Sequence, residues 1–191
     1  MAAVRVAALV MAACHGARYG GALPKQYQPL LGRTPIARVL DAFADHPAIG
    51  QLCCVIDPGM ADTFAAAAGA RHNVLIVHGG PTRQDSVRNG LEALAALPEP
   101  PDLALIHDAA RPLLPPSAID GVLACLAEAD AAAPALPIAD TLSGRDDIGF
   151  GAEVDRATLL QRQTPQGFRF AAILAAHRRF AGADAHGPAT D

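Results

Sequence analysis

The sequence predicts an α/β domain with a Rossmann-like, mostly parallel sheet and helices on both faces. Short apolar runs alternate with segments whose apolar residues recur at helical spacing, and this rhythm is typical of repeated strand–helix–strand units. The apolar runs are continuous, as expected for strands that are covered on both faces. The length of 191 residues fits one domain with a sizeable core.

Four strands are predicted, and each of them is a short apolar run. They are Val4–Met11, Gln51–Ile56, Asn73–Val77 and Leu103–Ile106. Right-handed crossovers between such strands would place them in one sheet, with their carboxyl ends at the same edge.

Helices are predicted between these strands. The clearest one begins after Thr34, a favourable N-cap, with Pro35 in the first turn, and its apolar residues recur at helical spacing as far as Phe43. Three further helices are predicted: one begins at Ser117, one covers Gln84–Leu97, and a weaker one covers Met60–Ala68.

The alternation ends after residues 135–138. From Asp140 to about Phe168 the chain is rich in Gly, Asp, Arg and Thr and has weak periodicity, which indicates an excursion from the sheet and not another crossover. No repeat or low-complexity linker divides the chain, so residues 1–191 are expected to form a single domain.

The composition restricts the classes of function. The formal net charge is −4, which argues against a broad basic face for nucleic acid, so an anionic ligand would have to be met by a local group of cations. Lys25 is the one lysine among 15 basic residues. The single lysine either arises by chance in an Arg-biased composition or has a function that requires a compact ammonium group.

The cysteines and histidines show no metal-binding or disulfide pattern. Four cysteines form no C-x-x-C pair and seven histidines are scattered, so a reduced, cytoplasmic setting is expected. No membrane association is expected either, because the N-terminal apolar run is short for a membrane span. Arg5 and the apolar run that ends before Cys14 can also be read as a short lipoprotein signal peptide. We favour the strand, because the run is short and carries a single positive charge before it.

Three polar loops follow predicted strands and should meet in one crevice, because ligands of open parallel sheets bind at the carboxyl ends of the strands. They are the loops at Ala12–Lys25, at His78-Gly79-Gly80 and at His107–Pro112. The first contains Gly16, Gly20 and Gly21 but fits neither the dinucleotide fingerprint nor a Walker A loop. With Arg18 and Lys25 it is either a cradle for a triphosphate or an ordinary turn.

Other polar residues of these loops also allow two interpretations. Asp108 could hold Mg²⁺ on phosphates, or it could cap a turn or pair with Arg111. Gly80 could let a base approach the backbone, or it could serve only to turn the chain. Ser86 could contact a ligand or satisfy backbone donors.

No nucleophile elbow of the G-x-S-x-G type is present, and no sequence cue links a cysteine to a histidine base. Phosphoryl and nucleotidyl transfer need neither, because a phosphate acceptor is already a nucleophile and catalysis consists mostly of positioning and charge stabilisation. The sequence supplies cations for such a reaction and no obvious base.

Taken together, the motifs resemble those of the 2-C-methyl-D-erythritol 4-phosphate cytidylyltransferase family, over nearly the whole chain. In order they are Ala12-Ala13-x-x-Gly16-x-Arg18, Pro24-Lys25-Gln26-Tyr27, Gly79-Gly80 with Arg83 and Asp85-Ser86-Val87, His107-Asp108-Ala109-Ala110-Arg111-Pro112, Asp140-Thr141, Val154-Asp155-Arg156 and Gln163-Thr164-Pro165-Gln166.

The resemblance implies a nucleotidyltransferase fold and a reaction in which methylerythritol phosphate attacks the α-phosphorus of CTP, with Mg²⁺ present and pyrophosphate released. It implies catalytic roles for Arg18, Lys25 and Arg156. The implied substrate-binding residues are Ala12, Ala13, Gly16, Gly80, Arg83, Ser86, Asp108, Ala109, Arg111, Thr141, Thr164 and Thr190, with Asp108 also a candidate metal ligand.

Within that list the resemblance places Ala12, Ala13, Gly80 and Ser86 around the cytidine, and Asp108 and Arg111 near the ribose and the acceptor. Thr141, Arg156 and Thr164 would position methylerythritol phosphate. The excursion, at about residues 139–157, would be an arm that reaches a second subunit, so a homodimer with Thr141 and Arg156 donated in trans is expected.

Three departures from the family pattern stand out. Cys14 replaces a usual glycine, and Pro81 follows Gly80 where some members have an acidic residue. The sequence stops at Thr190-Asp191, inside a Thr-Asp substrate motif of the family, which leads us to expect a fragment of a longer protein, with fusion to the cyclodiphosphate synthase of the same pathway as one form.

Two other functions fit the same pattern. A ribitol 5-phosphate cytidylyltransferase would share the fold and the chemistry but use another acceptor. A nucleotide-binding module that has lost catalysis is the second alternative, and the presence of Arg18, Lys25 and Arg156 argues against it.

Overall fold

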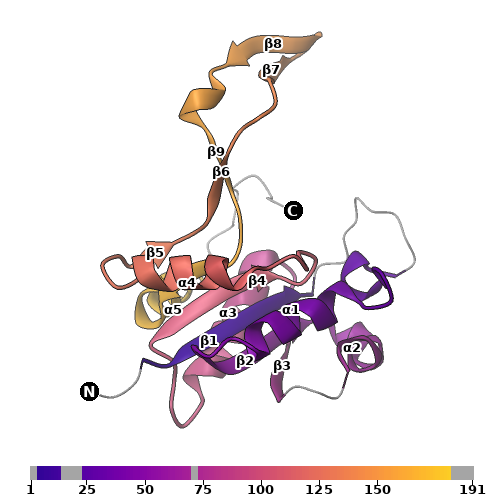
Figure 1. Ribbon diagram of the computed structural model, residues 1–191, viewed down its shortest axis with the longest axis vertical. Helices are drawn as coiled ribbons and strands as arrows, with labels where there is room; N and C mark the ends of the chain where they lie inside the picture. The colour runs from indigo at the N-terminus through magenta and orange to yellow at the C-terminus, as the bar shows by residue number, and fades with distance from the viewer. Residues whose placement is uncertain (1–3, 14–22, 70–72, 182–191) are drawn as a thin grey trace.

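A six-stranded sheet forms the centre of the protein (Figure 1), seen in a computed structural model that describes residues 4–13, 23–69 and 73–181. Its strand order is β3-β2-β1-β4-β10-β5. The strands are β1 (Val6–Ala12), β2 (Ile49–Ile56), β3 (Val74–His78), β4 (Leu103–Asp108), β5 (Ala131–Ala132) and β10 (Gln166–Arg169). The first four are parallel to one another, and β10 runs antiparallel to both β4 and β5.

The predicted mostly parallel α/β fold is therefore confirmed. Each of the four predicted strands is present, with ends shifted by at most two residues. The predicted irregular stretch was wrong at its end, because Gln166–Phe168 belong to β10. This short strand is held by pairing with β4, and its Gly167 is buried so closely that a Cβ there would lie 2.3 Å from Val122.

Two helical layers cover the sheet. The helices α1 (Pro35–Ala44), α2 (Ala61–Ala68) and α4 (Pro116–Cys125) pack on one face, and α3 (Arg83–Ala95) and α5 (Phe170–Arg179) pack on the other. Along β1, Ala8 and Val10 belong to the first core and Ala7 and Leu9 to the second. Burial of alternate residues on opposite faces explains why the strands have continuous apolar sequences.

Helix α1 begins as its sequence predicts. The Thr34 hydroxyl oxygen accepts from the Ala37 backbone N–H at 3.3 Å, and it donates to the carbonyl of Ala67 in α2 at 2.7 Å. The cap residue thus also joins two neighbouring helices. The side chains of Ile36, Leu40 and Phe43 are fully buried against the sheet.

Between β5 and β10 the chain leaves the body and forms a long arm (Figure 1). At its base β6 (Ala135–Pro137) pairs antiparallel with β9 (Leu160–Arg162). At its far end β7 (Leu142–Asp146) and β8 (Gly149–Val154) form a second two-stranded sheet. Ile148 and Phe150 at the tip are more than nine-tenths exposed.

Three 3₁₀ turns complete the described structure: η1 (Lys25–Tyr27), η2 (Pro58–Met60) and η3 (Arg156–Thr158). Within the described residues, no helix has both the length and the apolar character that crossing a membrane requires.

Candidate functional site

The described residues of the polar loops that follow β1, β3 and β4 lie against one another at the carboxyl edge of the sheet. The Ala109 N–H donates to the Met11 carbonyl at 3.0 Å, and the Gly79 N–H donates to the Ile56 carbonyl at 2.8 Å. A Cβ built on Gly79 would lie 2.6 Å from the Cβ of Ala13. The described residues of the three loops, Ala12 and Ala13 included, are thus brought together as the sequence predicts.

Lys25 is held at this edge by the residues around it. Gln26 is buried, and its side-chain amide donates to the Ala12 carbonyl at 2.9 Å. The Tyr27 hydroxyl, also buried, lies 3.5 Å from the same carbonyl. Burial raises the pKa of Tyr27 and keeps its hydroxyl protonated. Because Pro24 is buried as well, the segment is anchored on both sides of Lys25, which itself is exposed.

The loop after β3 is organised by Ser86, at the start of α3. The Ser86 hydroxyl accepts from the Gly80 N–H at 3.0 Å and lies 3.4 Å from the Gly80 carbonyl. The interpretation of Ser86 as a partner of backbone groups therefore has direct geometric support. A Cβ on Gly80 would lie 2.5 Å from the Asp85 Cβ, so close packing with α3 requires glycine here.

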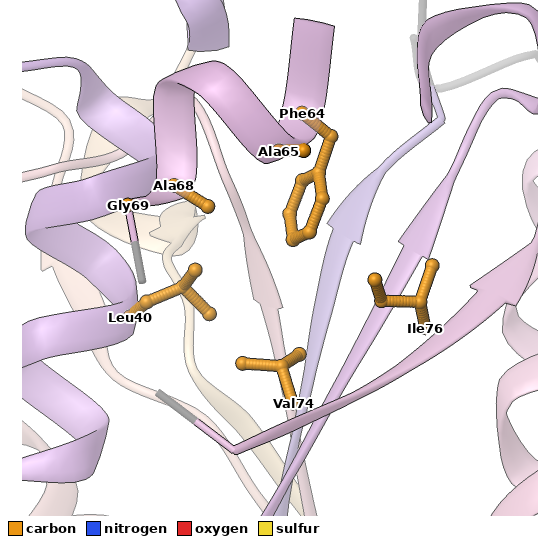
Figure 2. Close-up of a pocket in the computed structure, with 7 residues that line it drawn as sticks. All are labelled: Leu40, Phe64, Ala65, Ala68, Gly69, Val74 and Ile76. Carbon is orange, nitrogen blue, oxygen red and sulfur yellow. The ribbon is translucent and has the colours of Figure 1, made fainter. Parts of the chain in front are cut away.

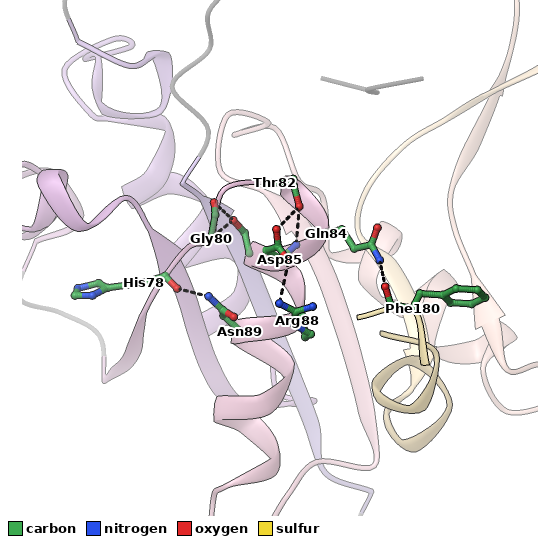
Figure 3. Close-up of polar contacts among 9 residues, drawn as sticks. His78, Gly80, Thr82, Gln84, Asp85, Arg88, Asn89 and Phe180 are labelled. Atoms are coloured by element: carbon green, nitrogen blue, oxygen red, sulfur yellow. Dashed lines mark hydrogen bonds and ion pairs between the residues drawn. The ribbon is translucent and has the colours of Figure 1, made fainter. Parts of the chain in front are cut away.

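Polar contacts fix the start of α3 further (Figure 3). The Thr82 hydroxyl accepts from the Asp85 N–H at 3.0 Å and donates to its carboxylate at 2.7 Å. Arg88 donates to the same carboxylate at 2.9 Å, and Asn89 donates to the His78 carbonyl at 3.1 Å. These contacts hold the N-terminus of α3 beside the glycine loop, an arrangement that favours anionic groups.

Asp108 connects three parts of the edge. One carboxylate oxygen accepts from the Arg83 guanidinium at 3.0 Å and the other accepts from Arg111 at 3.1 Å. Arg111 also donates to the side-chain carbonyl of Gln163, on the segment that returns from the arm. The ion-pair interpretation of Asp108 is thus present in the structure, and the two arginines leave a net positive charge around one carboxylate.

His107, in β4, also connects the Arg111 loop with the segment that returns from the arm. Its ring is buried, with Nε2 3.0 Å from the Arg111 carbonyl and Nδ1 2.9 Å from the Thr164 hydroxyl. The edge of the ring packs against Phe43, with 5.5 Å between ring centroids. Burial lowers the pKa of His107 and keeps the imidazole neutral. Thr164 itself is half-buried.

Two predicted site residues lie apart from this edge. Thr141 precedes β7 and Arg156 opens η3, both on the arm that projects away from the body (Figure 1). Both are exposed, and the Arg156 guanidinium donates to the Ala139 carbonyl within the arm. Gly16, Arg18 and Thr190 lie outside the described residues, as does Cys14.

The described residues do not form a metal site made by protein alone. No group of three or more His, Cys, Asp or Glu side chains among them could hold a metal ion. Mg²⁺ commonly binds one or two carboxylates together with substrate phosphates, and Asp108, at the edge of the sheet, fits that smaller requirement.

An apolar pocket of about 330 Å³ lies elsewhere, between α1, α2 and β3 (Figure 2). It is lined by Leu40, Phe64, Ala65, Ala68, Gly69, Val74 and Ile76. None of the predicted site residues is among them, and the lining offers no charge for a phosphate. The polar edge is therefore the candidate functional site.

The sequence profile of one family, described as IspD: 2-C-methyl-D-erythritol 4-phosphate cytidylyltransferase, matches residues 6–191. The chain belongs to this family. Among curated relatives, a bifunctional enzyme IspD/IspF of Rhodospirillum rubrum is 50% identical over 179 residues, covering 93% of this chain and 46% of that protein. One of the same name from Rhizorhabdus wittichii is 49% identical over 173 residues, covering 91% and 44%.

The chain thus spans about half the length of the curated relatives that it matches. Among solved structures, 2-C-methyl-D-erythritol 4-phosphate cytidylyltransferase of Thermus thermophilus is 32% identical, with a TM-score of 0.73 over 93% of this chain and 77% of that one. The IspD fold therefore extends over nearly all of the chain.

Within the candidate site, three residues hold other side chains or segments in place and were not among the predicted site residues. Gln26 holds the Lys25 segment, Gln163 holds Arg111, and His107 holds Thr164. All three stand inside sequence motifs that carry the family resemblance. Motif membership was thus a signal for their importance, but only the structure gives their partners.

Proposed function

We propose that this protein transfers the cytidylyl group of CTP to 2-C-methyl-D-erythritol 4-phosphate, forming 4-diphosphocytidyl-2-C-methyl-D-erythritol and pyrophosphate. One observation carries the proposal: the loops after β1, β3 and β4 and the segment returning from the arm meet at one edge, with Lys25, Arg83 and Arg111 among them. Membership of the IspD family supports this choice among nucleotidyl transfers.

In the proposed reaction, a phosphate oxygen of the acceptor attacks the α-phosphorus of CTP. The new O–P bond forms while the bond from the α-phosphorus to the bridging oxygen of the β-phosphate breaks, and pyrophosphate leaves with the electron pair. Lys25, whose side chain is exposed at the edge, and Arg18 would stabilise the negative charge of the transition state. No protein base is required, because the acceptor phosphate is already an anion.

The nucleotide would bind against the backbone of the loops after β1 and β3, where small residues let a ligand come close. We assign Ala12, Ala13, Gly16, Gly80 and Ser86 to the CTP side of the site, and Arg83, Asp108, Ala109 and Arg111 to the ribose and acceptor. The ion pairs of Asp108 hold both arginines in place before the substrates bind, which reduces the ordering that binding requires.

Mg²⁺ is the proposed cofactor. Held by the phosphates of CTP with Asp108 as the candidate protein ligand, it would neutralise phosphate charge.

We further propose a homodimer in which the arm of one subunit completes the site of the other. Thr141 and Arg156 lie on the arm, away from the edge that their substrate would occupy, and the exposed Ile148 and Phe150 offer apolar surface for a contact. Thr141 and Arg156 would position the acceptor together with Thr164 and Thr190.

A reducing, cytoplasmic location is also proposed, and the free cysteines Cys53 and Cys54 fit it.

The test is pyrophosphate release by the full chain with CTP and Mg²⁺, comparing methylerythritol 4-phosphate with ribitol 5-phosphate. Preference for the first supports the proposal. Preference for the second would retain the fold and the mechanism but assign the alternative ribitol 5-phosphate cytidylyltransferase. No release with either would favour a nucleotide-binding module without catalysis.

A further inference from the structure

The buried contact between His107 and Thr164 determines more than the position of the two side chains. A carbonyl oxygen can only accept a hydrogen bond, so the His107 Nε2, 3.0 Å from the Arg111 carbonyl, must carry the proton of the ring. In the neutral imidazole the other nitrogen, Nδ1, then has a lone pair and no proton. The Thr164 hydroxyl, at 2.9 Å, must donate to it.

The surroundings of the ring make this arrangement hard to reverse. His107 is 1% exposed, and the T-shaped contact with Phe43 fixes the plane of its ring. If the Thr164 hydroxyl turned its proton toward a ligand, the Nδ1 lone pair would remain buried without a partner, which is costly. The proton of Thr164 is therefore already used, and its oxygen has only lone pairs left for the site.

We propose that His107 is a positioning residue that makes Thr164 a hydrogen-bond acceptor toward the site, so that Thr164 binds a hydroxyl group of the acceptor substrate and not its phosphate. An unprotonated phosphate oxygen has no proton to donate, whereas a polyol hydroxyl does. The inference rests on the proposed function for the identity of the ligand. It assigns a specificity to Thr164 that its residue type alone would not give.

The backbone supports the same role. Strand β10 pairs antiparallel with β4, with Gln166 opposite Ile106, so Thr164 lies two residues before β10, just beyond the carboxyl end of β4 in that ladder. His107 and Thr164 thus connect the loop that carries Asp108 and Arg111 with the segment returning from the arm. Substitution of His107 should therefore affect binding of the acceptor more than binding of CTP, because Lys25 and Gly80 are held by other contacts.

The first test needs no substrate. Long-range ¹⁵N–¹H correlation spectra of the ¹⁵N-histidine-labelled full chain report the tautomer of each ring, and the His107→Gln variant identifies the His107 signals by their loss. We expect a protonated Nε2 and an unprotonated Nδ1 at neutral pH. A protonated Nδ1 would overturn the inference, because Thr164 would then be free to donate. If the variant fails to fold, selective labelling and a contact from Nδ1 to Thr164 provide the assignment.

The second test uses two variants that each retain one end of the ring. Asn at position 107 retains an acceptor near the place of Nδ1, and Gln retains a donor near the place of Nε2. We expect His107→Gln to raise the KM for the acceptor substrate about ten-fold, as loss of one ordinary hydrogen bond does, with the KM for CTP unchanged and a smaller effect of His107→Asn. Equal effects of the two, or a matching rise for CTP, would indicate a merely structural role and overturn the inference.

His46→Gln is the matched control, because His46 is also buried but pairs with Asp120 in α4, away from the site. A double-mutant cycle with Thr164→Val completes the test. If His107 acts through Thr164, His107→Gln changes the KM for the acceptor substrate little once Thr164 is Val, whereas multiplying effects would contradict the inference.

The choice of a hydroxyl is tested with acceptor analogues that each lack one hydroxyl. One analogue, the one that lacks the hydroxyl bound by Thr164, should bind the wild type more weakly than the complete acceptor does, and Thr164→Val should not weaken its binding further. If Thr164→Val weakened the binding of every analogue equally, the hydroxyl contact would be refuted. If the wild type releases no pyrophosphate with any acceptor, the proposed function fails, and the tautomer measurement still decides the state of Thr164.

Discussion

Replacing Gly79 with alanine should destabilise the protein by closing a space that two loops share. A Cβ at this position would lie 2.6 Å from the Ala13 Cβ and 2.9 Å from the Ser86 hydroxyl oxygen. Gly79 does not have the positive φ that Gly32, Gly69 and Gly149 have, so the reason is space and not backbone conformation. Since Ala13 has no flexible side chain, the ends of β1 and β3 must move apart by several tenths of an ångström.

The expected size follows from two opposing effects. Overpacking of a tight contact costs about 1–3 kcal/mol, and the reduced freedom of the unfolded chain returns about 0.4–1 kcal/mol. We expect a net loss of about 1–2 kcal/mol in the free energy of unfolding, measured by urea titration at constant m-value. The KM for CTP should rise with it, because the displaced loops form the proposed nucleotide side of the site.

Gly121→Ala is the matched control. Gly121 lies in α4, is exposed, and a Cβ there would meet nothing within 4 Å. Because alanine favours a helix more than glycine does, this variant should gain roughly 0.5–1 kcal/mol. If Gly79→Ala were as stable as the wild type and bound CTP equally well, the argument that the loops after β1 and β3 are in tight contact would be wrong.

Four further predictions concern the site, the assembly and the titrating side chains. Lys25→Ala should lower kcat by roughly two orders of magnitude or more, as loss of a transition-state donor does, and near-normal turnover in a steady-state assay would exclude the assigned role. Mixing inactive Arg18→Ala and Arg156→Ala subunits should restore one working site per heterodimer, whereas no recovery after confirmed subunit exchange would argue against sharing of the arm. Burial raises the pKa of Cys53 to about 12, so Cys53 and Cys54 should resist alkylation in the native protein while exposed Cys125 reacts, as peptide mapping by mass spectrometry would show. Burial and the nearby Arg88 lower the pKa of His177 in α5 below 6.5, so its contribution to stability is complete above that value and is lost as the pH falls below it; the free energy of unfolding should depend less on pH between 7 and 5.5 in His177→Gln, and an unchanged slope would contradict the shift.

The sequence predicted the four parallel strands and the helices α1 to α4 because local signals determine them. Strand β1 is apolar on both faces, and the Thr34-Pro35 pair marks the start of α1. Strand β10 and helix α5 were not predicted. Residues Gln166–Arg169 form a strand only because β4, about 60 residues earlier, offers an edge for pairing, and such non-local pairing leaves little trace in four residues.

The candidate site shows the same division between local and distant contacts. The rule that ligands bind at the carboxyl ends of parallel strands brought Ala12, Gly80 and Asp108 to one edge. The rule gave no information on the segment that returns from the arm, where Gln163 is hydrogen-bonded to Arg111 and Thr164 to His107. Those contacts join residues more than 50 positions apart, so their motifs were visible in the sequence while their pairing was not.

The paired strands at the base of the arm have a consequence for how such a protein can diverge. The chain leaves and re-enters the body through β6 and β9, which are joined by their own hydrogen bonds. The register of β4 with β10 is set within the body and does not depend on the length of what lies beyond that base. Insertions, deletions and changes of sequence in the arm can therefore accumulate separately from the candidate site at the carboxyl edge of the sheet, so that preference for an acceptor could evolve while the proposed chemistry on CTP is inherited unchanged.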